Sequence, residues 1–381
     1  MEKIIGGLLF AFLALFPFGQ LTRLPLFSQL PEVHLYLTDV VLFFLVSVWW
    51  IWGVWGVLVK REKYQLPPLA KPIFLFIALA GLSLAVNSPL FSGLPASRQS
   101  REVGVGFLYL LRWIFYAGLY FVLFDLKERS RHEMSRIHDQ RSELPWLKKD
   151  WSCFLIIIGS TVAVFGLIQY FLWPNLKALE VLQYDPHFYR VVGSFLDPGF
   201  TGIILVFTLI LILVNLFNGS CHALSPKNTH KGNPFWGSPC ACHPFILILG
   251  IILYITLALT YSRASWLAFL VGIMIIILMK KAWKILPVLL VLVVATFYLL
   301  PRPAGEGGKI ERTYTIEARL TNYRQALIIA KDHPFFGVGF NTYRYAQRNY
   351  GFIEKDWQIS HAGAGVDNSW LFVLATTGIF G

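Results

Sequence analysis

The sequence predicts an all-α integral membrane protein that crosses the membrane about ten times. Only 14% of its 381 residues are charged, 56% are hydrophobic, and the mean hydropathy is +0.59. Soluble domains carry about a quarter charged residues, and here most of the charged residues lie between long apolar runs. These observations exclude an ordinary soluble domain, a disordered chain and a fibrous repeat.

Nine apolar runs have the character of membrane-spanning helices. Such a helix needs about 20 apolar residues to cross a hydrocarbon layer roughly 30 Å thick. In chain order the predicted spans are Ile4–Phe18, Val40–Val59, Ile73–Val86, Phe107–Phe124, Cys153–Trp173, Phe200–Phe217, Phe245–Tyr261, Ala264–Met279 and Ile285–Leu300. The first run resembles a signal peptide but lacks a small-residue cleavage site, so we expect it to be retained. A tenth span begins near Ser369 and stops at Gly381 before crossing, which predicts a truncated chain or a partial sequence.

The distribution of Lys and Arg predicts the orientation. With the N-terminus inside, the inner segments hold 17 of these residues and the short outer loops hold 6, as the positive-inside bias requires. The net charge of +12 is thereby explained by topology, and no nucleic-acid partner is expected. All four cysteines then lie on the reducing side, so no disulfide framework is predicted. Their spacing is not typical of a zinc site, so we expect neither a metal nor a cofactor.

Two short outer segments carry an arginine beside the start of a helix. Asp197-Pro198 is a typical helix start, and Arg190 lies close before it. Ser262 precedes Arg263 in a minimal turn between two spans, and an arginine at a helix N-terminus favours phosphate binding. Considered alone, Arg190 is also explained as an ordinary arginine whose side chain extends to the membrane interface. Arg263, considered alone, fits both phosphate binding and this interfacial placement.

The long outer loop, residues 301–368, contains a predicted amphipathic helix and a titratable pair. Apolar residues at Leu320, Tyr323, Leu327 and Ala330 follow helical spacing, and Arg319 lies off that stripe. Nearer the last span lie His361, a candidate base near neutral pH, and Asp367, which could orient the histidine or act itself. Considered alone, the amphipathic helix is also explained as a solvated lid. His361 alone is more simply an exposed histidine at the membrane interface.

Together these segments place three arginines and a candidate base on one predicted face. An enzyme that acts on a lipid-linked pyrophosphate needs this combination, because arginines neutralise the phosphates while a base takes a proton from the incoming hydroxyl.

The same segments resemble the family of O-antigen ligases and O-antigen polymerases, which are bacterial envelope glycosyltransferases. The resemblance covers residues 190–381 in the family's order. Its strings are Arg190…Gly193-Ser194-Phe195…Asp197-Pro198-Gly199, Thr260-Tyr261-Ser262-Arg263, Arg319 with the following DHPFFGVGFNTY at 332–343, and Asp367-Asn368-Ser369-Trp370-Leu371. The resemblance implies an N-terminal region of five spans, 1–189, and an O-antigen ligase-like domain, 190–381, that includes the long outer loop.

The resemblance also implies a GT-C-like fold and a metal-independent glycosyl transfer on the outer face of the cytoplasmic membrane. The donor would be an undecaprenyl-pyrophosphate-linked glycan, the acceptor a glycan or the lipid A core, and the surroundings membrane lipids. By position, Arg190, Arg263 and Arg319 would bind the pyrophosphate, and His361 or Asp367 would be the base. Ligases commonly carry histidine where this chain has Asp367, which favours a polymerase over a ligase. A flippase for the same lipids would need a polar path through the membrane, and only Arg112 lies deep in a predicted span.

Overall fold

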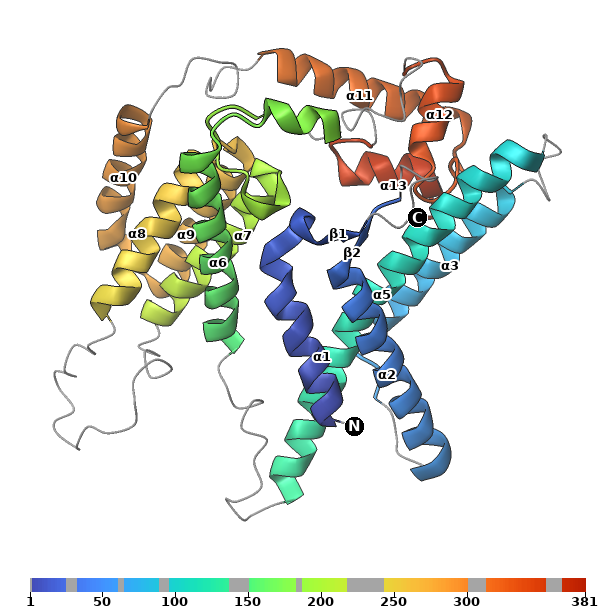
Figure 1. Ribbon diagram of the computed structural model, residues 1–381, viewed down its shortest axis with the longest axis horizontal. Coiled ribbons are helices and arrows are strands. Elements are labelled where there is room, and N and C mark those ends of the chain that lie inside the picture. Colours follow the sequence, from blue (N-terminus) through green and yellow to red (C-terminus); the bar gives the residue numbers. More distant parts are fainter. Residues whose placement is uncertain are drawn as a thin grey trace. The chain divides into compact units, whose positions relative to one another are not determined.

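The computed structural model describes residues 2–24, 33–60, 65–88, 96–136, 151–182, 187–217, 243–300, 313–353 and 365–381. The described residues are mostly helical, which confirms the all-α prediction (Figure 1). They form two compact units that we describe separately. Unit 1 comprises Met1–Phe12, Arg23–His138 and Arg312–Gly381, and unit 2 comprises Leu13–Thr22 and Asp139–Glu311.

Among the described residues, six helices are long and apolar enough to cross a membrane. They are Lys3–Thr22, Leu37–Gly56, Arg101–Arg129, Ser152–Leu172, Pro198–Leu216 and Arg263–Lys280. Three shorter apolar helices, Ala70–Val86, Phe245–Leu259 and Trp283–Thr296, coincide with the other predicted spans. At the tenth position a helix of nine residues ends at Thr377. A multi-pass membrane protein is therefore confirmed, while a full set of ten spans remains a prediction.

Unit 2 is a helical bundle. Its elements are η1 (Phe16–Thr22), α6 (Trp151–Leu172), η2 (Lys177–Leu182), η3 (Gly193–Phe195), α7 (Pro198–Phe217), α8 (His243–Leu259), α9 (Arg263–Lys280), η5 (Trp283–Ile285) and α10 (Leu286–Leu299). Leucine and isoleucine side chains from α7, α8 and α9 form its core. Small residues allow close approach, as membrane helices require, since a Cβ at Gly202 would lie 2.3 Å from Ser265 Oγ.

Unit 1 contains helices from both the N-terminal and the C-terminal parts of the chain. It contains most of α1 (Glu2–Leu15), then β1 (Arg23–Leu24), β2 (Leu35–Tyr36), α2 (Leu37–Lys60), α3 (Ala70–Val86), α5 (Ala96–Arg136), α11 (Thr313–Asp332), α12 (Tyr343–Asn349) and α13 (Ser369–Thr377). The strands β1 and β2 pair antiparallel, with Arg23 opposite Tyr36 and Leu24 opposite Leu35. In unit 1, α2 and α3 pack on α5, and α11 packs on α13 (Figure 1).

The helix predicted within residues 301–368 is confirmed as α11, but its packed face differs from the predicted stripe. Ala326, Ile329 and Ala330 are buried against α12 and α13, whereas Leu320 and Leu327 are about half exposed. The periodicity correctly identified a helix. It misplaced the packed face because small alanines permit closer helix contact than leucines do.

Candidate functional site

In unit 2, the segment that carries Arg190 is clamped between α6 and α7. Gln169 Oε1 accepts from Val192 N at 2.9 Å, and Gln169 Nε2 donates to the Arg190 carbonyl at 3.3 Å. Thr201 Oγ1 donates to the Val192 carbonyl at 2.6 Å. A buried amide on one helix and a hydroxyl on the next therefore hold a segment that is not itself helical.

The Arg190 side chain is buried and faces main-chain carbonyls. Its Nε donates to the Thr260 carbonyl at 3.0 Å, and its Nη2 donates to the Tyr261 carbonyl at 3.4 Å. These carbonyls directly follow the C-terminus of α8, where helical carbonyls lack intrahelical donors and a cation is favoured. Arg190 is only 8% exposed, so it is not an arginine that reaches out to the membrane interface. It fixes the turn that joins α8 to α9.

That turn presents Arg263 at the first position of α9. Tyr261 has a positive φ of 51°, and Ser262 is the N-cap residue, as predicted, because its side chain accepts from Ser265 N. Arg263 itself is exposed. The close contact of Gly202 with Ser265 holds the same helix end against α7. Arg263 therefore combines an exposed guanidinium with the positive end of a helix dipole.

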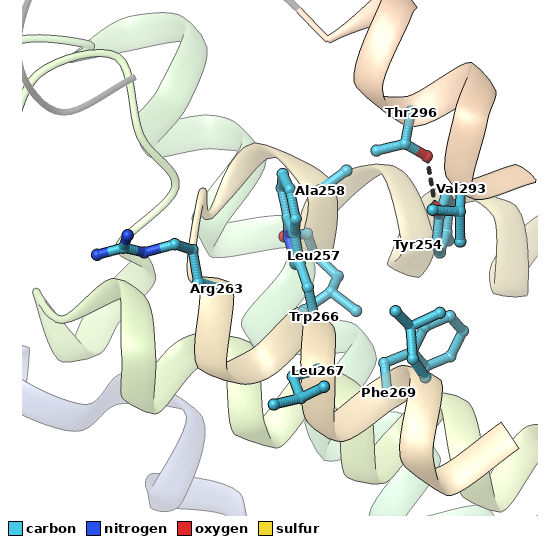
Figure 2. Close-up of a pocket in the computed structure, with 10 residues that line it drawn as sticks. Tyr254, Leu257, Ala258, Arg263, Trp266, Leu267, Phe269, Val293 and Thr296 are labelled. Carbon is cyan, nitrogen blue, oxygen red and sulfur yellow. Dashed lines mark hydrogen bonds between the residues drawn. The ribbon is translucent and has the colours of Figure 1, made fainter. Parts of the chain in front are cut away.

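An apolar cavity of about 230 Å³ lies beside this arginine, between α8, α9 and α10. Leu257, Trp266, Leu267 and Phe269 contribute to its walls, and Tyr254 hydrogen bonds with Thr296 there. Figure 2 shows the Arg263 side chain extending away from these residues. The guanidinium of Arg263 therefore points away from the cavity that this residue helps to line.

The predicted helix start at Asp197 is also confirmed. Asp197 Oδ1 accepts from Phe200 N, and Pro198 is the first residue of α7. Asp197 thus acts as a helix cap. Just before it, Ser194 donates to the Pro17 carbonyl, which fastens η1 to this segment.

In unit 1, the structure brings together Arg319 and Asp367, which are 48 residues apart. Arg319 Nε lies 3.2 Å from Asp367 Oδ2, and both side chains are 53% exposed. Asn322 Nδ2 donates to the Gly365 carbonyl at 2.9 Å, which holds the neighbouring main chain against α11. Asn368 caps α13 by accepting from Trp370 N and Leu371 N. The other candidate base, His361, lies outside the described residues.

The DHPFFGVGFNTY segment anchors α13 to α3. Ser83 Oγ lies 2.6 Å from the Phe336 carbonyl and 2.7 Å from that of Thr376, and it is fully buried. Gly337 has a φ of 60°, and a Cβ there would lie 2.3 Å from the Thr376 carbonyl carbon. This segment therefore has an architectural role that requires glycine.

The pKa values of two tyrosines at the ends of α12 are raised. Burial raises the pKa of Tyr343 to about 12. Burial, followed by the hydrogen bond to Asp332, raises the pKa of Tyr350 to about 12. Both phenols are neutral at physiological pH and support α12 against α11. They contribute structure, not a base.

Sequence reasoning missed the residues that position these groups. Gln169 and Ser83 are polar residues within apolar runs. Their position could have identified them, because a polar residue within a membrane span usually makes a specific contact. Asp39, which precedes a predicted span, was missed as the partner of Arg112.

The described fold is that of a multi-pass helical membrane protein with an exposed arginine, Arg263, at the start of a helix. Residues 246–381 match the family described as O-antigen ligase. This C-terminal part of the chain is therefore similar to the O-antigen ligase family, whose members transfer glycosyl groups, and the predicted resemblance is supported there. No curated protein and no solved structure matches the chain.

Proposed function

We propose that this protein is a glycosyltransferase that transfers or polymerises glycans carried on undecaprenyl pyrophosphate. It acts at the outer face of the bacterial cytoplasmic membrane, with its N-terminus in the cytoplasm. The observation that carries the proposal is Arg263, an exposed guanidinium at the N-terminus of α9. A helix N-terminus with an arginine favours a phosphate group.

In this proposal the predicted arginines have different roles. Arg263 contacts the pyrophosphate, and Arg319 supplies a second cation from the outer-loop region. Arg190 was predicted as a third ligand, but its hydrogen bonds to the Thr260 and Tyr261 carbonyls favour positioning of the turn before Arg263. The arginine charge stabilises the pyrophosphate leaving group as the bond to the sugar breaks.

The transfer step needs a base near the acceptor. The acceptor hydroxyl loses its proton, its oxygen bonds to the anomeric carbon, and undecaprenyl pyrophosphate departs with the electrons of the broken C–O bond. We propose His361 as the base, with Asp367 as the alternative. The ion pair of Asp367 with Arg319 is half exposed, and such pairs contribute only about 0–1 kcal/mol, so substrate can separate them.

Asp367 stands directly before Asn368, where ligases commonly carry histidine, so the proposal favours a polysaccharide polymerase. A lipopolysaccharide O-antigen ligase is the alternative within the family. A flippase is the alternative in another class, but Arg112, a cation within a predicted span, is paired with Asp39, which argues against a polar transport path.

Arg263 is tested by substitution. Arg263→Lys keeps the charge but loses the bidentate fork, and both it and Arg263→Ala should lose most polymer formation while the protein still accumulates in the membrane. Lys280→Ala, at the other end of the same helix, is the matched control and should stay active. Near-normal polymer formation by Arg263→Ala would refute the assignment.

The base is tested with His361→Ala and Asp367→Asn. If His361 is the base, His361→Ala should be nearly inactive while it still binds donor, and wild-type activity should fall below about pH 6.5. If Asp367 is the base, only Asp367→Asn should show that loss. Full activity in both variants would exclude this loop from the chemistry.

A further inference from the structure

An ion pair between Asp39 and Arg112 lies in unit 1, where α2 begins beside α5, and both oxygens of its carboxylate accept hydrogen bonds. Arg112 Nη2 lies 2.8 Å from Asp39 Oδ2, and Arg112 Nε donates to Asp39 Oδ1 at 3.1 Å. Tyr116 Oη donates to Asp39 Oδ1 at 2.9 Å, and Tyr36 N donates to Oδ2 at 3.0 Å. The carboxylate is buried, with 8% of its side chain exposed, and receives four donors.

The arginine is less enclosed than its partner. Its side chain is 28% exposed. Besides the carboxylate, it donates through Nη1 to the His34 carbonyl at 3.3 Å, and its guanidinium carbon lies 5.0 Å from the centroid of the Tyr36 ring. These hydrogen bonds use three of the five guanidinium N–H groups. The guanidinium can therefore donate to a further acceptor without leaving Asp39.

Arg112 and Asp39 form part of the wall of a cavity of about 330 Å³. The rest of the wall is mainly aromatic and aliphatic, and it includes Phe43, Phe44, Leu108, Leu111 and Phe115. The cavity therefore combines one partly exposed cation with a hydrocarbon lining, the two features needed to hold a lipid by its head and its chain.

We infer that this cavity binds a glycerophospholipid of the bilayer, with the phosphodiester on Arg112 and an acyl chain against the apolar wall. Arg112 lies one to two helical turns inside the predicted span Phe107–Phe124. An arginine at this depth reaches the headgroup level.

The charge of the site selects the class of lipid. The Arg112–Asp39 pair is neutral as a whole, so it tolerates a phosphodiester with a single negative charge better than a group with several. A pyrophosphate carries more charge and would lie near the Asp39 carboxylate, where like charges repel. A bilayer phospholipid is therefore favoured over the lipid-linked donor of the proposed function. The inference is independent of that function.

The experiment measures binding of phosphatidylglycerol to the purified full-length chain by native mass spectrometry. The double variant Asp39→Asn with Arg112→Gln removes both charges and leaves no unpaired buried ion. It should bind phosphatidylglycerol about tenfold more weakly, the factor expected when a charge-assisted hydrogen bond is lost. Leu111→Trp fills the cavity without altering the pair and should lose binding similarly. Phe107→Trp, on an exposed position outside the cavity wall, is the matched control and should bind normally.

Two results would overturn the inference. Equal phosphatidylglycerol binding by the wild type, the double variant and Leu111→Trp would make the ion pair purely structural. Displacement of phosphatidylglycerol by equimolar undecaprenyl pyrophosphate, with the same dependence on Arg112, would assign the cavity to the donor.

Discussion

Arg190→Ala distinguishes a positioning role from direct contact with the donor. In the structure its guanidinium donates to two carbonyls, and the residue is 8% exposed. A buried polar group left without its partner costs about 1–3 kcal/mol, so truncation should lower the free energy of unfolding by about 2–4 kcal/mol. For a unit of this size that corresponds to a fall in Tm of roughly 5–15 °C. Arg263→Ala removes an exposed side chain and should change stability by less than about 0.5 kcal/mol.

The decisive assay is a double-mutant cycle on donor affinity. If Arg190 acts by holding the turn before Arg263, both single variants should bind donor weakly, and Arg190→Ala should add little further loss in the Arg263→Ala background. Arg190→Lys should restore part of the stability and of the affinity, since a single ammonium can reach one carbonyl. A wild-type Tm for Arg190→Ala, together with an additive loss of affinity in the double variant, would refute the positioning role and indicate direct contact.

Two further predictions concern helix packing and alkaline pH. Gly202→Ala should reduce both Tm and transferase activity, because its Cβ cannot fit against α9, whereas Gly250→Ala, where a Cβ meets nothing within 4 Å, should be neutral. Because burial raises the pKa of Tyr343 to about 12, above the unfolded value of about 10, its stabilising contribution is complete below about pH 10 and is lost as the pH rises toward 12. Thermal unfolding should therefore show the wild type losing stability relative to Tyr343→Phe only above about pH 10. A constant difference in Tm from pH 8 to 11.5 would contradict the assignment.

The sequence alone predicted where the apolar helices lie and two of their N-caps, although α5 extends well beyond its predicted span. Long apolar runs must form helices in a membrane, because every main-chain polar group there needs an internal partner. The caps at Asp197 and Ser262 are local features, since each accepts from a main-chain N–H three residues further on. The resemblance to the O-antigen ligase family was likewise predicted from short strings, of which DHPFFGVGFNTY is the most specific.

Only the tertiary structure decided what each charged side chain contacts. Arg190 reaches a carbonyl 70 residues away, Arg112 reaches a carboxylate 73 residues away, and Arg319 reaches one 48 residues away. Hydropathy and helical spacing record which residues are apolar and which face they share, but not which helices become neighbours. Inside an apolar bundle a charge must find a partner wherever the fold brings one close, so the partner and the role that follows from it depend on the packing of distant segments.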